Sequence, residues 1–153
     1  MEREYVIHPI GFVRSAVKSL DGAPKQGALA GTEAEIVVYE IYADALEGLA
    51  MRTGPPGEAP FPGDTHRKSG KIIVMCWMDR ADRARRKVHP RGRENSPERG
   101  VFSTRSPHRP NPISIHTVEL LEVRGTVLRV RGMDAVDGTP VVDIKPHSPE
   151  LDG

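Results

Sequence analysis

The chain has 153 residues, a formal net charge of +1 and a single cysteine. This length suits one domain with one hydrophobic core, and no apolar run approaches the roughly 20 residues of a membrane helix, so we expect a soluble, cytoplasmic protein with no membrane partner. One cysteine excludes an internal disulfide, and its place in the apolar run of residues 72–77 predicts that Cys76 is a buried thiol rather than a nucleophile.

Two strands are predicted in the first third of the chain. Residues 6–14 alternate between apolar and polar side chains, and residues 34–42 are rich in β-branched and aromatic side chains, as half-buried strands are. The glycine- and proline-rich residues 22–31 between them predict a loop. This part of the chain therefore favours a β-rich fold.

A short helix and a long loop are predicted next. Asp44 is followed three residues later by a glutamate, which is the spacing of a capping box and predicts a helix over residues 44–51. Ala45, Leu46 and Leu49 are expected to face inward from that helix. Residues 54–64 contain four prolines and three glycines, a composition that excludes a regular element.

The second half of the chain carries the main strands. Residues 71–79 are a near-continuous apolar run, which predicts a central strand buried on both faces. Residues 115–123 and 126–131 are predicted strands joined by a two-residue turn at Arg124-Gly125, and a further strand follows an Asp-Gly turn. At least six short strands and no G-x-G-x-x-G motif predict a mainly β, single-domain barrel with one or two short helices, not a Rossmann-like fold.

The most informative stretch is residues 100–114, GVFSTRSPHRPNPIS, which we call the proline-rich segment. Its three prolines fix φ, remove backbone donors and hold the preceding residues extended, so a helix is excluded. The segment is expected to form a rigid platform that presents Arg105, His108 and Arg109. By composition alone, a basic proline-rich linker remains the alternative.

Positive charge is concentrated around this segment. Residues 80–109 hold ten of the 22 Lys and Arg residues but three of the 21 Asp and Glu residues. Such a patch is typical of a surface that contacts a polyanion, although a solvated charged surface is the alternative. The six histidines show no paired metal-ligand spacing, so no metal site is predicted.

Four segments in a fixed order resemble the TsaA-like (TrmO) family of S-adenosylmethionine-binding proteins. They are residues 10–15 (IGFVRS), residues 24–26 (PKQ), the proline-rich segment and residues 134–146 (DAVDGTPVVDIKP). The resemblance spans nearly the whole chain. It implies the family's β-barrel, S-adenosyl-L-methionine as the cofactor, and methylation of N6-threonylcarbamoyladenosine beside the tRNA anticodon at its exocyclic nitrogen.

The resemblance also implies which residues hold the cofactor. In this chain they are Pro24, Lys25, Gln26, Asp79, Arg80, Arg105, Ile115, Asp134, Ala135, Val136 and Asp137. Two of them depart from the family pattern, because Lys25 stands where the family has arginine and Asp79 where it usually has histidine. The lysine keeps the charge but loses the planar fork of arginine, and the carboxylate still accepts hydrogen bonds from amines and hydroxyls.

The sequence identifies no catalytic base, and the candidate catalytic residues are Asp134, Asp137 and Arg109. Substrate contacts are expected from Arg83, Arg85, Arg86, His108, Arg109 and Asn111. Arg109 is expected to pair with the threonyl carboxylate of the modified tRNA through a charge-assisted fork. The structural alternatives are turn-capping carboxylates in residues 134–137 and an exposed loop histidine at His108.

We expect a single TsaA-like domain over residues 1–153, without the additional C-terminal domain of the fuller bacterial members. A homodimer with the cofactor site near its interface is also expected. The alternative function is a non-catalytic S-adenosylmethionine-binding regulator or interaction protein whose basic surface faces nucleic acid. Methylated product would indicate the enzyme, and cofactor binding without turnover would indicate the regulator.

Overall fold

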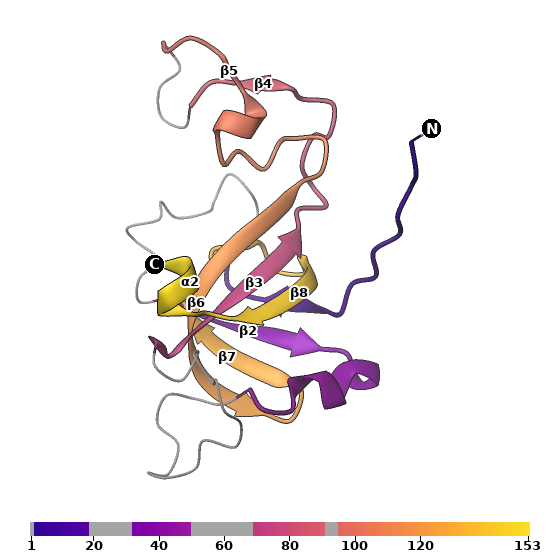
Figure 1. Cartoon of the computed structure of the whole chain (residues 1–153), viewed down its shortest axis with the longest axis vertical. Helices are drawn as coiled ribbons and strands as arrows, with labels where there is room; N and C mark the ends of the chain where they lie inside the picture. Colours follow the sequence, from indigo (N-terminus) through magenta and orange to yellow (C-terminus); the bar gives the residue numbers. More distant parts are fainter. Residues whose placement is uncertain (1, 19–31, 50–68, 91–94) are drawn as a thin grey trace.

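The computed structural model describes residues 2–18, 32–49, 69–90 and 95–153. Within these residues six antiparallel strands close a barrel in the order β1-β2-β7-β6-β3-β8 (Figure 1). The strands are β1 (Gly11–Arg14), β2 (Glu33–Val38), β3 (Lys71–Trp77), β6 (Ile113–Arg124), β7 (Val127–Arg131) and β8 (Pro140–Pro146). The predicted mainly β barrel is confirmed.

Smaller elements lie outside the barrel wall. They are the two-stranded ribbon of β4 (Lys87–Val88) and β5 (Arg99–Gly100), the 3₁₀ helices η2 (Glu40–Leu46) and η3 (Val101–Ser103), and the short helix α2 (Pro149–Asp152). Figure 1 shows the ribbon and η3 beyond one end of the barrel, where the chain passes from β3 to β6. The proline-rich segment therefore lies at that end.

The barrel interior is the hydrophobic core. Val13, Ile36, Leu128 and Val130 come from three different strands and are fully buried, because alternate residues of each strand face inward. Burying such a side chain contributes about 1.5–3 kcal/mol to stability. Cys76 is also fully buried in this core, as predicted.

The first strand is shorter than the predicted residues 6–14. Pairing begins at Ile10, whose amide donates to the carbonyl of Val141 at 2.8 Å, and β1 itself starts at Gly11. Pro9 has no amide hydrogen and cannot extend the ladder. Residues 2–9 are exposed, and Figure 1 shows this N-terminal segment standing away from the barrel.

The capping-box prediction was wrong in its details. β2 ends at Val38, and η2 begins at Glu40 with Tyr39 as an extended N-cap that makes no side-chain capping bond. Asp44 lies inside η2 rather than before it. Of the predicted inward residues, Leu46 and Leu49 do pack against the core, whereas Ala45 is exposed, because the element is a 3₁₀ helix that begins earlier than the predicted α-helix.

The predicted hairpin between β6 and β7 is confirmed with its turn shifted by one residue. β6 continues to Arg124, which pairs with Val127, so the two turn residues are Gly125 and Thr126. Gly125 has φ +58°, a left-handed conformation that glycine adopts without steric cost. The predicted loops at residues 22–31 and 54–64 lie outside the described residues.

Candidate functional site

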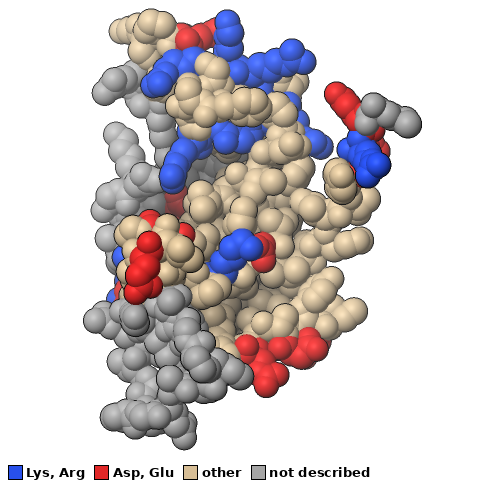
Figure 2. All heavy atoms as spheres, in the orientation of Figure 1, with Lys and Arg blue, Asp and Glu red and all other residues tan. Residues whose placement is uncertain are grey.

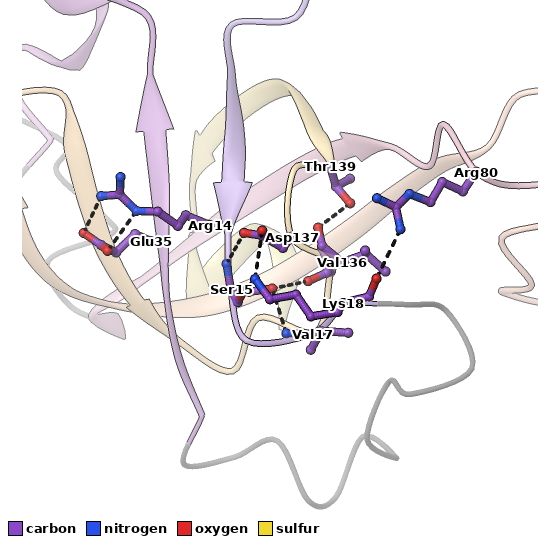
Figure 3. A network of polar contacts seen from close by, with 10 residues as sticks. Arg14, Ser15, Val17, Lys18, Glu35, Arg80, Val136, Asp137 and Thr139 are labelled. Atoms are coloured by element: carbon purple, nitrogen blue, oxygen red, sulfur yellow. Dashed lines mark hydrogen bonds and ion pairs between the residues drawn. The ribbon is translucent and has the colours of Figure 1, made fainter.

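Asp137 joins the loop between β7 and β8 (residues 132–139) to the end of β1. Its Oδ1 accepts a hydrogen bond from the Ser15 amide at 2.9 Å, and its Oδ2 accepts one from Lys18 Nζ at 3.0 Å (Figure 3). These two contacts, the Ser15 amide first, lower the pKa of the Asp137 carboxyl. Asp137 is therefore an anionic anchor for the loop, which matches the turn-capping alternative.

The middle of that loop is packed against the rest of the protein. The side chains of Ala135 and Val136 are buried in the core. The Ala135 carbonyl accepts a hydrogen bond from Ser15 Oγ at 2.8 Å, and the Val136 carbonyl accepts one from Thr139 Oγ1 at 2.6 Å. The loop is thus held rigidly from both sides.

The end of β3 lies beside the same loop system. Asp79 and Arg80 directly follow β3 and are both exposed. Arg80 Nη1 donates to the carbonyl of Lys18 at 3.2 Å, so the segments after β1 and after β3 meet here, as Figure 3 shows. Lys18 also donates through its Nζ to Asp137, so two predicted cofactor-binding residues, Arg80 and Asp137, contact the same residue.

Ile115 lies on an open edge of β6. Met78 N donates to the carbonyl of Pro112, and Leu120 N to that of Gly70, so even-numbered residues of β6 form the hydrogen-bonded pairs with β3. The amide and carbonyl of Ile115 consequently face the other edge. On that edge β7 pairs with β6 only from Glu119 onward. Within the described chain, the backbone of Ile115 therefore faces an edge without a strand partner.

Ser114 and His116 are functional candidates that the sequence interpretation missed. His116 Nδ1 lies 2.8 Å from Asp134 Oδ1, and His116 Nε2 lies 2.7 Å from Ser114 Oγ. Both residues share the inward face of β6 with Val118 and Leu120, which are buried. Polar side chains in the core-facing register of a strand are the sequence signal that would have found them.

Arg109 holds the proline-rich segment together. Its Nη2 donates to the carbonyls of Val101 at 2.5 Å and Thr104 at 2.6 Å, while its buried Nε has no hydrogen-bond partner among the described residues. His108 is also occupied, because its Nδ1 accepts a hydrogen bond from the Asp82 amide at 2.9 Å. These two side chains, which the sequence predicts to be presented by the platform, are instead engaged in hydrogen bonds that hold the segment in place.

Arg83 fastens the segment after β3 to the proline-rich segment. Its Nε donates to the carbonyl of Pro110 at 2.8 Å, its Nη2 lies 3.4 Å from Asn111 Oδ1, and its guanidinium stacks on Trp77 with 5.0 Å to the ring centroid. Arg85 pairs with Asp82 at 3.5 Å. These contacts leave Arg83 less free to bind a ligand than an unpaired arginine.

A second group of cations makes no side-chain contact within the described part of the chain. Its members are exposed and lie on or beside the ribbon, and they are Arg86, Lys87, Arg99 and Arg105. Figure 2 shows Lys and Arg side chains gathered over the end of the molecule where β4 and β5 lie. This basic end is available to a polyanion.

The predicted residues Pro24, Lys25 and Gln26 lie outside the described residues. Among the residues that the structure describes, no group of three His, Cys, Asp or Glu side chains is placed to hold a metal ion, and no helix is long and apolar enough to cross a membrane. A cavity of about 450 Å³ lies between η2 and the barrel, lined by Tyr42, Leu46 and Ile144 among others. None of the predicted site residues lines it, so its size does not mark the site.

Comparisons with known proteins match this chain over most of its length. Residues 65–153 match the family model described as the tRNA-methyltransferase O N-terminal domain. An S-adenosyl-L-methionine-binding protein of Archaeoglobus fulgidus is 42% identical over 96% of this chain and 92% of that protein. A human tRNA (adenine(37)-N6)-methyltransferase is 31% identical over 94% of this chain but 30% of its own length.

The fold comparison agrees. The crystal structure of TrmO from Pseudomonas aeruginosa superposes with a TM-score of 0.70 at 27% identity, covering 99% of this chain and 59% of that one. The chain thus spans about three fifths of the solved TrmO structures it resembles. From the family model, the identity to the archaeal protein and the shared barrel, it follows that this chain belongs to the TrmO (TsaA-like) family.

Proposed function

We propose that this protein binds S-adenosyl-L-methionine and transfers its methyl group to the exocyclic N6 nitrogen of N6-threonylcarbamoyladenosine in tRNA. The observation that carries the proposal is that contacts at one end of the barrel connect several of the segments that the family resemblance implies for the cofactor. Arg80 and Asp137 both contact Lys18, and Asp134 contacts His116, which lies one residue after Ile115 in β6. The human relative named as a tRNA (adenine(37)-N6)-methyltransferase supports the reaction type.

The residues at this end fit the chemical groups of the cofactor. The open edge of β6 offers the backbone amide and carbonyl of Ile115 to an adenine, beside the exposed apolar side chains of Ile113 and Ile115, which are 41% and 51% exposed. The exposed carboxylate of Asp79 can accept hydrogen bonds from ribose hydroxyls or an amine. Arg105 has a free guanidinium for the amino-acid carboxylate.

When bound, S-adenosyl-L-methionine supplies an activated methyl group on a sulfonium. The protein's task is then to position the acceptor nitrogen in line with that methyl, a contribution that needs no metal. A rigid site serves this best. The anchored loop of residues 132–139 and the platform held by Arg109 provide rigid walls on two sides.

The tRNA is proposed to lie on the basic end. Each phosphate that an arginine or lysine contacts releases condensed counterions, which strengthens binding at low salt. Arg86, Lys87 and Arg99 are exposed and have no competing side-chain partner within the described residues. Arg109 is the proposed contact for the threonyl carboxylate of the tRNA. The Arg109 side chain also supports the proline-rich segment through Nη2, so the contact would use its other N–H groups.

A homodimer is part of the proposal. Three neighbouring apolar side chains in the N-terminal segment, Tyr5, Val6 and Ile7, are 83%, 79% and 53% exposed. Phe102, on the proline-rich segment, is 85% exposed. Burying these side chains against a second copy would remove an apolar surface from water close to the cofactor site.

The proposal is tested by incubating the purified protein with S-adenosyl-L-methionine and tRNA, then measuring methylated nucleosides by mass spectrometry. We expect methylation of tRNA that carries the threonylcarbamoyl group and none of tRNA that lacks it. In the double variant Arg86→Ala/Lys87→Ala we expect a higher KM for tRNA and an unchanged kcat. The slope of the logarithm of tRNA affinity against the logarithm of salt concentration should become shallower by up to about one for each lost phosphate contact.

Arg124→Ala is the matched control, because this exposed arginine lies in the β6–β7 hairpin rather than on the basic end. It should leave both kinetic constants unchanged. Cofactor binding without transfer to threonylcarbamoylated tRNA would reject the methyltransferase and favour the regulator. An equal loss in the Arg124 variant would show that total charge, rather than the basic end, determines tRNA binding.

A further inference from the structure

Three polar side chains form a continuous hydrogen-bonded chain inside one end of the barrel. Asp134 Oδ1 lies 2.8 Å from His116 Nδ1, and His116 Nε2 lies 2.7 Å from Ser114 Oγ. The side chains of His116 and Asp134 are 11% and 27% exposed, so the chain is partly shielded from solvent but not closed to it. Hydrogen bonds of this kind are stronger there than in water.

The order of acceptors and donors fixes the proton positions. A carboxylate only accepts, so Nδ1 of a neutral His116 carries the proton and donates to Asp134. Nε2 is then an acceptor, and the Ser114 hydroxyl donates to it. A carboxylate that orients an imidazole, which in turn faces a hydroxyl, is the arrangement that lets a hydroxyl pass a proton to a base.

Among the described residues, Cys76 also faces this chain, and its thiol does not compete as a base. Cys76 pairs with Ser114 across β3 and β6, and burial raises the pKa of its thiol to about 12. The thiol therefore stays neutral in the working range. The Cys76 carbonyl lies 3.5 Å from Ser114 Oγ and offers the hydroxyl a second acceptor when His116 is protonated.

The free end of the chain lies next to the candidate cofactor position. Ser114 adjoins Ile115, whose backbone faces the open edge of β6, and Asp134 begins the segment that the family resemblance implies for the cofactor. The same part of β6 therefore carries the polar chain on its inner face and the proposed nucleoside contact, the backbone of Ile115, on its open edge.

We propose that Ser114, His116 and Asp134 form a proton relay that accepts the proton lost by the nitrogen that receives the methyl group. The inference rests on the proposed function. An N6 nitrogen bearing a threonylcarbamoyl group still carries one hydrogen, and it cannot keep that hydrogen and end neutral after methylation. A base is therefore required. His116 lies in β6, and residues 132–139 of the anchored loop contain no histidine.

The step balances as a substitution. The acceptor nitrogen forms a bond to the methyl carbon while the carbon–sulfur bond breaks and its electron pair stays on sulfur. The hydrogen of the acceptor nitrogen passes to Ser114 Oγ as the Ser114 hydroxyl proton passes to His116 Nε2. Asp134 stabilises the imidazolium that results, and the proton leaves to solvent after product release.

A purely structural role is the competing explanation, since the His116–Asp134 contact also ties residues 132–139 to β6. The variant His116→Gln separates the two, because its amide can still donate to Asp134 but cannot accept a proton. We expect kcat to fall about 10²-fold or more, the range general bases contribute, with cofactor affinity unchanged. Ser114→Ala should lower kcat at least about tenfold, also with unchanged cofactor affinity.

Two readouts move only if the relay exists. The pH profile of kcat should differ between the wild type and His116→Gln, because only the wild type carries a base at this position. In ¹⁵N spectra of the cofactor-bound protein, neutral His116 should carry its proton on Nδ1. His8→Gln, which changes an exposed histidine of the N-terminal segment, is the control for the spectral assignment and should keep full activity.

The outcomes separate the relay from the function on which it rests. An active wild type with an equally active His116→Gln variant would overturn the relay alone. A neutral His116 protonated on Nε2 would also overturn it. A wild type that binds the cofactor but methylates no threonylcarbamoylated tRNA would overturn the proposed function, and the relay with it.

Discussion

A single carboxylate, Asp137, determines how the loop before β8 meets the end of β1. It binds the Ser15 amide and the Lys18 ammonium at the same time, and both favour its charged form. Asp134, three residues earlier in the same loop, contacts His116 on β6. The two carboxylates therefore tie the loop to different strands, Asp137 to the end of β1 and Asp134 to β6.

The anchoring role predicts a pH-dependent stability. A carboxyl whose pKa is lower in the folded protein stabilises it above the unfolded pKa of about 3.9, and this contribution is lost as the pH falls through the folded value. Asp137→Asn should therefore lower the melting temperature at pH 7, and the difference from wild type should shrink near pH 3. Thermal melts at both pH values measure this.

Glu47→Gln is the control for that experiment, since Glu47 is an exposed carboxylate in the segment after η2. It should melt like wild type at both pH values. If Asp137→Asn also melts like wild type at pH 7, the anchor contributes nothing and the loop is held by its backbone hydrogen bonds alone.

Strand β1 is paired on both edges, with β2 on one side and β8 on the other. A Cβ added at Gly11 would lie 2.1 Å from the carbonyl oxygen of Val37. That oxygen belongs to a paired strand and cannot move away as a flexible side chain would. Glycine at this position is therefore a requirement of barrel closure.

Gly11→Ala should accordingly destabilise the barrel by about 1–3 kcal/mol, the usual cost of overpacking. Gly100→Ala is a matched control, because a Cβ there meets nothing within 4 Å and its φ of −58° suits any residue. Chemical denaturation should show a lower unfolding midpoint for the Gly11 variant only. Equal midpoints for the two variants would mean that β1 and β2 separate without penalty.

The elements also show how far the sequence could predict the fold. The run that became β3 was recognised because it is almost continuously apolar, and the runs that became β6 and β7 because they flank a two-residue turn. The start of β1 and the 3₁₀ form of η2 were not, since they depend on pairing partners distant in sequence. Local propensity contains no information about such partners.

The candidate site was predictable only in part for the same reason. The motifs after β3 and before β8 were recognised from their order along the chain, and the structure places them side by side. The pairing of His116 with Asp134 was not, because it requires the closed barrel to bring β6 against a loop 18 residues later. The internal contacts of Arg83 and Arg109 were hidden for a similar reason.

At the scale of the whole molecule, a chain with a net charge of +1 separates its charges in space. Lys and Arg side chains gather at the end that holds the ribbon, as Figure 2 shows, and the ribbon lies in the connection from β3 to β6. A polyanion drawn to the basic end would therefore approach the start of β6, where Ile115 lies. Electrostatic attraction would thus bring a polyanion toward the proposed site.

The central claim is that this barrel end binds S-adenosyl-L-methionine, and calorimetric titration of the wild type beside Arg105→Ala tests it most directly. Arg105 is exposed and has no side-chain partner among the described residues, so its removal leaves the fold intact. We predict that the wild type binds and that Arg105→Ala binds at least about tenfold more weakly, as expected for the loss of a charge-assisted hydrogen bond. Equal affinity in both proteins, or no binding by the wild type, would contradict the claim.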